Sequence, residues 1–474
     1  MTVNIVLLFT KPKLYSMKNL FDQQLHQIQT SAKGKRILFA CVPADGHFNP
    51  LTGIAVHLQK IGYDVRWYTS ATFSEKLAKL NIPHYPFQKA LEINGDNIDE
   101  KFPDRKKAKS MIAKLNFDLK NFFIDRAPEY FEDIKAIHQS FPFDLFVADC
   151  AFTAIAFVEQ KLGIPAIAMG IIPLLAKSKD LAPYGLGMVP STTFFGKIKQ
   201  RTLHWVAKNF LFKPSNKALK ELCAEHQLSY EGQDVFNYNL DKSSVFLQSA
   251  TPGFEYERSD VPARVHYVGA LLPYAKPLAN QPWFDARLNK YDKVILVTQG
   301  TAEKDVTKLI KPTLEAFKNS DTLVVVTTAG AQTQELRAAY NYDNIIIEDF
   351  IPYAEVMPYV DVYVTNGGYG GTLLGIQNEL PLVVAGLHEG KSEICARVGY
   401  FNLGINLKTE RPIPRQIKNS VEAILANPVY KQNVSRLAQE FSQYNAGELT
   451  ASFVKRLTEE KAGKSELRRS TVLL

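Results

Sequence analysis

The sequence contains few cysteines, and they are too far apart to form a metal or redox motif. Cys41, Cys150, Cys223 and Cys395 are the four thiols in 474 residues. No two of them have the C-x-x-C spacing of a zinc site or of a thioredoxin-like site. Three lie inside apolar runs, which is typical of buried thiols in a reducing compartment. The cysteines therefore favour a cytoplasmic protein.

The start of the chain lacks a long apolar run. Val3–Phe9 is apolar but far shorter than the about 20 residues that a membrane-spanning helix needs. No basic region precedes this stretch and two lysines follow it closely, which argues against a signal peptide. We expect residues 1–33 to be an extension and 461–474 to be a tail. Met17 leaves the translation start open.

Charge of one sign is only mildly in excess. The chain has 56 Lys and Arg against 48 Asp and Glu, a net charge of +8 that is spread along the sequence. No nucleic-acid-binding motif accompanies this charge, so we expect no nucleic-acid partner. The basic surface leaves contact with an anionic membrane open without requiring it. Hydrophobic residues make up 46%, enough for a full core, and the length predicts two domains.

Strand-like runs alternate with helical patterns, and no repeat of solenoid length is present. Lys35–Val42, Leu51–Ile61 and Asp64–Thr69 read as a β-α-β unit, which implies a parallel sheet. The pattern restarts at Val294–Thr298, after a segment with three prolines. We therefore predict an α/β fold with two facing Rossmann-like domains. The expected parts are a first domain over 34–271, a linker over 272–293, a second domain over 294–445 and a closing helix over 446–460.

A loop with the sequence Pro-Ala-Asp-Gly-His-Phe-Asn-Pro joins the first strand to the next helix and carries His47. Ligands of open parallel sheets bind at this carboxyl edge. Asn49 suits the N-cap of the helix and Pro50 its first turn. His47 would then lie in the cleft, where an imidazole can take a proton from a hydroxyl group. A histidine that only caps or packs is the alternative, and the loop alone does not decide between them.

Asp149 ends the buried strand that follows residue 144, again at the carboxyl edge. A carboxylate beside an imidazole holds its tautomer and stabilises the imidazolium that forms during turnover. A single Asp in this place is more often the N-cap of the next helix, here one beginning at Phe152. Neighbouring strand ends would bring Asp149 to His47, which favours the functional interpretation.

A loop with four glycines, Thr365–Thr372, lies between a strand and a helix. Successive N–H groups at a helix start form an anion cradle. Tyr369 breaks the dinucleotide-binding Gly-x-Gly-x-x-Gly spacing, and no Gly-Lys-Ser/Thr follows. A tight turn is the alternative, but the position at a strand end favours a diphosphate site. The sequence has no Asp-x-Asp to bridge a metal to a diphosphate, so hydroxyls such as those of Thr301 and Thr372 would assist the helix.

Together these features resemble the inverting UDP-glycosyltransferase superfamily, which has the GT-B fold, and in particular its bacterial macrolide-glycosyltransferase-like branch. The resemblance covers roughly residues 35–455. The loop around His47 is similar to the family's P-x-x-G-H-x-x-P, which implies that His47 is the catalytic base. Ala148-Asp149, followed by Phe152, is similar to the segment of the catalytic aspartate.

In the second domain the resemblance implies a set of donor-binding residues. Val297-Thr-Gln-Gly-Thr301 is similar to the family's first strand and phosphate-binding hydroxyl, and Phe350-Ile351-Pro-Tyr353 to its base-stacking W-x-P-Q. The glycine loop is similar to its diphosphate loop, H-x-G-x-x-S/T. The implied donor-binding residues are Thr301, Phe350, Ile351, Tyr353, Asn366, Gly368, Gly370, Gly371, Thr372, His388, Glu389, Gly390 and Lys391.

The first domain would then bind the acceptor, and the helix over 446–460 would pack back toward it. We expect the acceptor pocket to be lined by Phe122 and Phe123 and by the loop that begins at Ile171 and carries Tyr184. Aromatic and aliphatic side chains of this kind suit a flat or lipophilic molecule. We expect a nucleotide-sugar co-substrate, and neither a metal nor a resident cofactor.

Departures from the family pattern bear on the donor. Asn366 stands where the family has histidine, and Leu374 where it has the carboxylate that binds both ribose hydroxyls. His388-Glu389-Gly390-Lys391 replaces the Asp/Glu-Gln pair that binds glucose, and is similar to bacterial enzymes that rhamnosylate flavonoids. The departures favour dTDP-rhamnose as donor. A UDP-glucose-dependent enzyme acting on small molecules or glycolipids and a GT-B-type nucleotide-sugar epimerase remain alternatives, and the sequence leaves the acceptor, the regiochemistry and the oligomeric state open.

Overall fold

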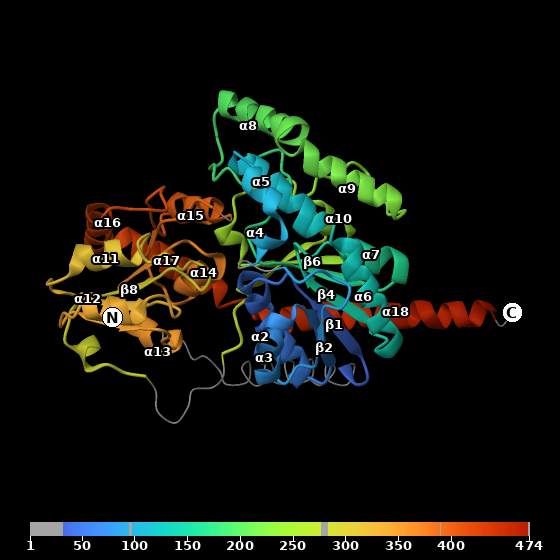
Figure 1. The fold of residues 1–474 in the computed structure, drawn as a ribbon, viewed down its shortest axis with the longest axis horizontal. Coiled ribbons are helices and arrows are strands. Elements are labelled where there is room, and N and C mark those ends of the chain that lie inside the picture. Colours follow the sequence, from blue (N-terminus) through green and yellow to red (C-terminus); the bar gives the residue numbers. More distant parts are fainter. Residues whose placement is uncertain (1–31, 94–96, 276–282, 389, 473–474) are drawn as a thin grey trace, which may run out of the picture.

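The structure, a computed structural model, describes residues 32–93, 97–275, 283–388 and 390–472. It contains two parallel β-sheets, each with its own helices, in two α/β domains side by side (Figure 1). The two-domain α/β fold expected from the sequence is confirmed. Most of the expected N-terminal extension lies outside the described residues. In the part of the chain described, no helix is both long and apolar enough to cross a membrane.

The N-terminal domain is built on a seven-stranded sheet in the order β3-β2-β1-β4-β5-β6-β7. Its strands are β1 (Arg36–Ala40), β2 (Asp64–Thr69), β3 (His84–Pro86), β4 (Leu145–Asp149), β5 (Ala166–Gly170), β6 (Val245–Ser249) and β7 (Val265–Gly269). Its helices are α2 (Asp45–Lys60), α3 (Ser74–Lys79), α4 (Ile98–Lys101), α5 (Met111–Asp118), α6 (Ala127–Ser140), α7 (Ile155–Phe157), α8 (Phe194–Val206), α9 (Lys213–Glu225) and α10 (Tyr238–Lys242). Three π-helical segments extend α5, α7 and α8: η3 (Leu119–Ile124), η4 (Val158–Leu162) and η5 (Ala207–Leu211).

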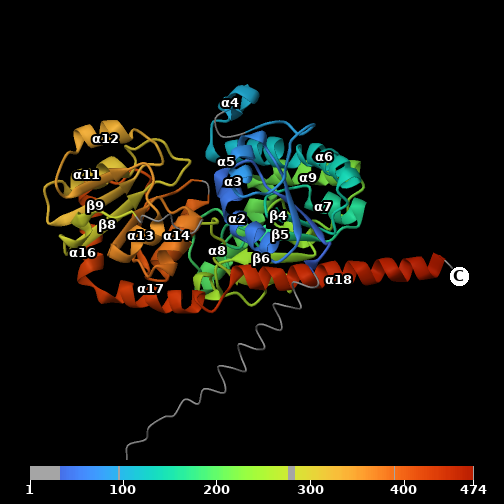
Figure 2. The same cartoon turned by 90° about the horizontal axis from the view of Figure 1, so that it is seen from below.

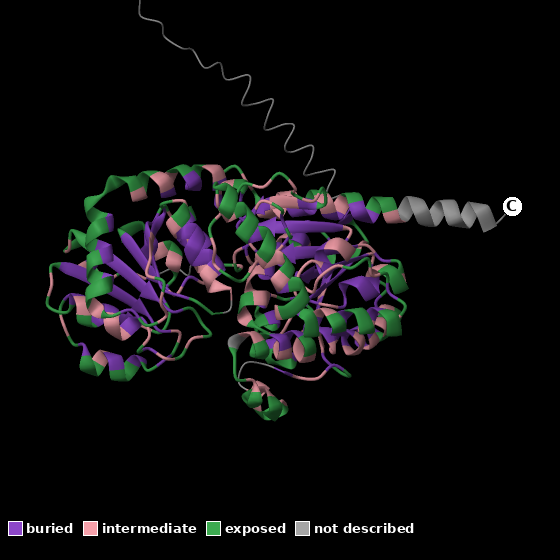
Figure 3. Cartoon of the chain, turned by 90° about the horizontal axis from the view of Figure 1, so that it is seen from above, coloured by how far each residue is buried: buried purple, intermediate pink, exposed green. Residues whose placement is uncertain are grey.

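The C-terminal domain is built on a six-stranded sheet in the order β10-β9-β8-β11-β12-β13. Its strands are β8 (Lys293–Thr298), β9 (Thr322–Thr327), β10 (Ile345–Glu348), β11 (Val362–Thr365), β12 (Leu382–Val384) and β13 (Gly404–Asn406). Its helices are α11 (Ile310–Phe317), α12 (Thr333–Ala339), α13 (Tyr353–Val356), α14 (Tyr369–Gln377), α15 (Lys391–Tyr400), α16 (Pro414–Ala426) and α17 (Pro428–Phe441). Val and Ile dominate these strands because helices bury the sheet on both faces (Figure 3).

Strand order fixes where ligands can bind. The chain winds outward in opposite directions from β1 and β4 in the first sheet, and from β8 and β11 in the second. Such switch points open a crevice at the carboxyl ends of the two strands, which is where ligands of doubly wound sheets bind. Each switch point is followed by loops in which the sequence predicted site residues.

The last helix, α18 (Ala446–Val472), crosses from the C-terminal domain back to the N-terminal one (Figure 2). It packs on α2, β4 and β7, and buries Ala451, Val454 and Leu457 in the N-terminal core. The helix continues to Val472, although the sequence suggested a tail from residue 461. Residues 455–470 are rich in Lys, Arg and Glu, which are good helix formers.

The helix after β1 begins earlier than the sequence suggested. Ala44 is its N-cap and Asp45 its first residue, so Asn49 is not the cap and Pro50 lies inside the helix. Proline lacks the N–H that would bond to the carbonyl four residues before, and here that residue is Gly46. The early start places His47 in the first turn of α2 instead of in a preceding loop.

Candidate active site

His47 and Asp149 meet at the switch point of the N-terminal sheet. β1 and β4 are neighbours, with Ala40 paired to Ala148, so both strands end at the same edge. Nδ1 of His47 donates to Oδ1 of Asp149 over 2.8 Å. Asp149 is completely buried, whereas the imidazole is partly exposed. The ring therefore turns its second nitrogen, Nε2, away from the carboxylate, and the sequence-predicted pair is brought together.

The carboxylate of Asp149 is fixed by further hydrogen bonds. Its Oδ2 accepts from the N–H of Val42 over 2.8 Å, and its Oδ1 accepts from the N–H of Ala151 over 2.9 Å. It does not cap a helix beginning at Phe152, since α7 begins at Ile155 with Ala154 as N-cap. Burial, together with the negative charge of Asp149, raises the pKa of the Cys150 thiol to about 12. The thiol thus stays protonated beside the pair.

The glycine loop lies at the switch point of the C-terminal sheet, between β11 and α14. Gly368 is the N-cap of α14, and the N–H groups of a first helical turn have no acceptor within the helix. A Cβ added to Gly370 would meet no atom within 4 Å. A Cβ on Gly371 would come within 3.2 Å of the Tyr363 hydroxyl. Gly370 is therefore where an anion can approach the helix start most closely.

Asn366 and the two expected hydroxyl groups have different surroundings. The side-chain amide of Asn366 donates to the carbonyl of Gln299 and so ties the loop after β11 to the loop after β8. Thr301 is exposed in that second loop. Thr372 is fully buried, and its Oγ1 has no hydrogen-bond partner among the described residues. Thr301 can meet a ligand directly, whereas Thr372 would do so only after a local rearrangement.

The segment after β10 presents one aromatic ring to solvent. Phe350 is 70% exposed, although phenylalanine side chains are usually buried. Ile351 is buried in the core of the domain, and the hydroxyl of Tyr353 lies 3.4 Å from that of Thr327. Of the three, Phe350 therefore offers a free face on which a base could stack.

Glu410 anchors the segment between β12 and α15. Its Oε1 accepts from the N–H of His388 over 2.9 Å, and its Oε2 lies 3.4 Å from the imidazole Nε2 of that residue. Gly390 has a φ of +78° and is the N-cap of α15. Lys391, the first residue of that helix, lines a cavity together with Asn366. Glu389 lies outside the described residues.

The same cavity contains charged residues that the sequence reasoning missed. Glu303, Lys308 and Glu410 line it, and Lys308 pairs with Glu303 and lies 3.8 Å from Glu410. Burial opposes ionisation of Glu303, but the hydrogen bond and charge of Lys308 and the N–H of Asp305 together outweigh it and lower the pKa of that carboxyl. No local motif marks these residues. The only signal in the sequence was that three charged residues, Glu303, Lys304 and Asp305, follow closely after Thr301.

A buried ion triad joins the two domains. Arg397 on α15 donates to Glu255 of the N-terminal domain over 2.8 and 3.1 Å, and to Glu393 over 3.2 Å. Oε1 of Glu393 accepts from the N–H groups of Gly185 and Gly187, each over 2.8 Å. The triad thereby ties the loop that carries Tyr184 to the helix that begins at Lys391.

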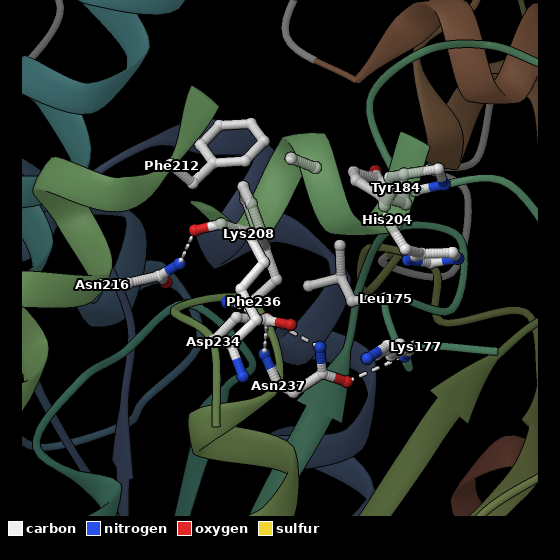
Figure 4. Close-up of a pocket in the computed structure, with 12 residues that line it drawn as sticks. Leu175, Lys177, Tyr184, His204, Lys208, Phe212, Asn216, Asp234, Phe236 and Asn237 are labelled. Atoms are coloured by element: carbon white, nitrogen blue, oxygen red, sulfur yellow. Dashed lines mark hydrogen bonds between the residues drawn. The ribbon is translucent and has the colours of Figure 1, made fainter. Parts of the chain in front are cut away.

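A pocket in the N-terminal domain is lined by Tyr184 and by residues of α8 and η5 (Figure 4). Its apolar walls include Leu175, Phe212 and Phe236. A Cβ on Gly390 would lie 3.1 Å from the Tyr184 hydroxyl, so this end of the pocket adjoins the C-terminal domain.

The other residues expected at the acceptor do not line this pocket. Ile171 is buried in the main N-terminal core, because its chain position directly follows the central strand β5. Phe122 stacks edge-on against Phe102 at 5.1 Å between ring centroids. Phe123 packs behind the pocket against a small cluster that includes Phe212. Tyr184 is thus the one of the four expected residues that lines this pocket.

The described part of the chain brings together no group of three His, Cys, Asp or Glu side chains that could hold a metal ion. Metal independence itself remains a prediction.

The carboxyl edges of the two sheets meet across the domain boundary. Tyr369, the first residue of α14, donates to the carbonyl of Ser249 at the end of β6 over 2.9 Å. The His47–Asp149 pair and the glycine-lined helix start thus lie on facing edges of two doubly wound domains. This is the architecture of a GT-B glycosyltransferase.

Comparison with known proteins gives the same class. Residues 311–455 match the family model "Erythromycin biosynthesis protein CIII-like, C-terminal domain". The chain is 31% identical over 413 residues to 4'-demethylrebeccamycin synthase of Lentzea aerocolonigenes, covering 87% of this chain and 97% of the relative. It is 29% identical to UDP-glucosyltransferase 1 of Beauveria bassiana, with 87% and 93% covered. The solved structure of the calicheamicin glycosyltransferase CalG4 superposes with a TM-score of 0.67 at 18% identity, with 89% and 98% covered.

The chain belongs to the UDP-glycosyltransferase superfamily of GT-B fold, in its macrolide-glycosyltransferase-like branch. It is a glycosyltransferase, and both the fold class and the family that the sequence motifs indicated are confirmed.

Proposed function

We propose that this glycosyltransferase moves a sugar from a nucleoside diphosphate donor to a hydroxyl group of a small lipophilic or aromatic acceptor, such as a flavonoid, with inversion. The observation that carries the proposal is the 2.8 Å contact of His47 Nδ1 with the buried Asp149. This contact fixes the tautomer in which Nε2 is unprotonated and able to accept a proton.

The step is a single displacement. The acceptor hydroxyl gives its proton to Nε2 of His47 as its oxygen bonds to the anomeric carbon. The bond from that carbon to the diphosphate oxygen breaks, and its electron pair leaves with the nucleoside diphosphate. Asp149 stabilises the imidazolium that results, because it is buried and held by two backbone N–H groups.

The leaving diphosphate is stabilised without a metal in this proposal. The first-turn N–H groups of α14 around Gly370, the exposed hydroxyl of Thr301 and the ammonium group of Lys391 supply the donors. A helix N-terminus carries partial positive charge, which favours an anion.

The donor that the C-terminal domain supports best is dTDP-rhamnose. Leu374 is partly buried and packs against the apolar core, so it offers no acceptor to a ribose 2′-hydroxyl. Deoxyribose lacks that hydroxyl. The segment that begins at His388 replaces the residues with which the family binds glucose.

A UDP-glucose donor is the second candidate, and the name of the Beauveria bassiana relative favours it. Competition of dTDP-rhamnose against UDP-glucose on one flavonol, read by mass spectrometry, tests the choice. We expect the higher kcat/KM for dTDP-rhamnose. A higher value for UDP-glucose would refute the donor and leave the displacement mechanism standing. Isomerised nucleotide sugar formed without acceptor would instead indicate an epimerase.

A further inference from the structure

Five large apolar side chains on α8 and η5 point away from the core. They form what we name the α8–η5 face: Phe194 (73% exposed), Phe195 (81%), Ile198 (44%), Trp205 (59%) and Phe210 (62%). Their aromatic rings contact one another, Phe194 with Phe195 at 5.7 Å and Trp205 with Phe210 at 5.2 Å between centroids. Exposed apolar side chains gathered in this way mark an interaction surface.

The α8–η5 face is separate from the side of the helix that packs against the domain. Gln200, His204 and Ala207 turn inward, where Gln200 is buried and the other two line the pocket of Tyr184. Phe194, Ile198 and Trp205 recur on the opposite side of the helix at spacings of four and seven residues. Packing of the domain is thus satisfied without the α8–η5 face. Helix α8 itself runs along the outer edge of the molecule (Figure 1).

The segment of the chain that carries this face has charge of one sign. Between Asp180 and Glu221 the sequence contains no Asp or Glu. The same stretch contains seven basic residues: Lys197, Lys199, Arg201, Lys208, Lys213, Lys217 and Lys220. Asp180 interacts electrostatically with Lys197, Glu221 lies 3.5 Å from Lys217, and Asp234 lines the inner pocket together with Lys208.

Helices that lie in a membrane interface typically combine exposed aromatic side chains with flanking lysine and arginine. Aromatic rings settle at the depth of the lipid headgroups, and each basic residue near an anionic surface adds to the attraction. A protein partner would need acidic groups around an apolar groove, whereas an anionic bilayer supplies both chemistries at once.

We propose that the α8–η5 face docks on a bilayer that contains anionic phospholipid. Phe194, Phe195 and Trp205 insert at the headgroup boundary, and Lys197 and Arg201 contact lipid phosphates. Docking brings the pocket of Tyr184 next to the lipid, since α8 and η5 form both the face and one wall of the pocket. That such a pocket receives an acceptor rests on the proposed function, whereas docking does not.

Co-sedimentation of the full chain with vesicles tests the docking directly. We expect binding to vesicles of phosphatidylcholine mixed with phosphatidylglycerol, weak binding to pure phosphatidylcholine, and loss of binding as salt rises. The variant F194S/F195S/W205S should bind at least about tenfold more weakly, because three apolar anchors are lost. The control I413S/L425S/V429S, which removes exposed apolar side chains from the other domain, should bind like the unaltered protein.

A charge variant keeps the test decisive if the serine variant fails to fold. K197E/K199E/R201E alters exposed side chains only and should abolish the preference for phosphatidylglycerol. Equal binding of this variant and the unaltered protein to anionic vesicles overturns the proposal. So does a dimer, detected by analytical ultracentrifugation, that is lost in F194S/F195S/W205S while the unaltered chain ignores vesicles. Because none of these measurements uses donor or acceptor, their outcome is independent of the proposed catalytic function.

Discussion

Arg397 donates two hydrogen bonds to a single carboxylate oxygen of Glu255 across the domain boundary, and both side chains are only 2% exposed. A cation buried between two carboxylates is stable only while its partners are present. Burial alone would lower the pKa of Arg397, but the charges of Glu255 and Glu393 and the contact with Tyr256 outweigh it and raise the pKa. The domain boundary is therefore held by charge as well as by apolar contact.

Arg397→Ala should lower the free energy of unfolding by about 3–5 kcal/mol, because it leaves two carboxylates buried without a cation. Arg397→Lys should recover only part of this loss, since an ammonium group cannot reproduce the planar fork. Urea denaturation followed by circular dichroism measures both. Arg456→Ala, which removes one partner of the exposed pair with Glu460, is the control and should change stability by no more than about 0.5 kcal/mol. A similar result for both alanine variants would contradict the importance of the triad.

His47→Ala should lower kcat about a hundredfold or more, which is the usual size of a lost general base, and leave nucleotide affinity largely intact. Asp149→Asn should also lower kcat, with little loss of fold. Kinetics and calorimetric titration with nucleoside diphosphate separate these effects. His57→Ala, in the last turn of the same helix, is the matched control and should keep its kcat. Near-normal turnover of His47→Ala would exclude it as base, and an Asp149→Asn that only lost thermal stability would indicate a structural role.

Two glycines of the same loop should respond to alanine in opposite ways. At Gly370 an added Cβ meets no atom within 4 Å, so Gly370→Ala should fold normally but raise the KM for the donor about tenfold by covering the helix start. At Gly367 the φ is +75° and an added Cβ meets the sulfur of Cys395, so Gly367→Ala should lower the melting temperature. Initial rates and thermal melts distinguish the two. An unchanged donor KM in Gly370→Ala would argue against the diphosphate cradle.

Glu410 should make the stability of the folded protein depend on pH in the acidic range. Burial opposes its ionisation, but the N–H groups of His388 and Leu387 and the nearby positive charges lower its pKa below the ordinary value of 4.5. A carboxyl whose pKa is lowered by folding stabilises the folded state above its unfolded pKa and loses that contribution as the pH falls through the folded pKa. The unaltered protein should therefore exceed Glu410→Gln in melting temperature above pH 4.5, and the difference should shrink below it. Glu422→Gln, on the exposed side of α16, should show no such trend.

Activity should survive EDTA. The groups proposed to hold the diphosphate are backbone N–H groups, a hydroxyl and an ammonium, and the sequence has no Asp-x-Asp. Rates measured before and after chelation and desalting give the answer. Loss of activity that magnesium or manganese restores would contradict the proposed stabilisation of the leaving group.

The sequence located those parts of the site that depend on strand ends. Parallel strands end at one edge, so the pairing of His47 with Asp149 could be predicted once their strands were taken as neighbours. The start of α2 could not be predicted, because proline suits the first turn of a helix better than its interior. Nothing in the sequence pattern indicated that this helix has Pro50 in its interior. The contacts of Glu255 with Arg397 and of Glu410 with Lys308 join residues about a hundred or more positions apart, which no local spacing encodes.

Because α18 packs on the N-terminal domain, the core of that domain can be completed only at the end of translation. Ala451, Val454 and Leu457 complete a core whose other buried members lie between residues 32 and 271 and so leave the ribosome much earlier. During translation, part of the apolar surface of α2, β4 and β7 stays uncovered until the whole C-terminal domain and α18 have been synthesised. The domain that emerges first is therefore among the last to be finished, and a fragment ending at the linker would expose to solvent the surface that α18 covers in the complete chain.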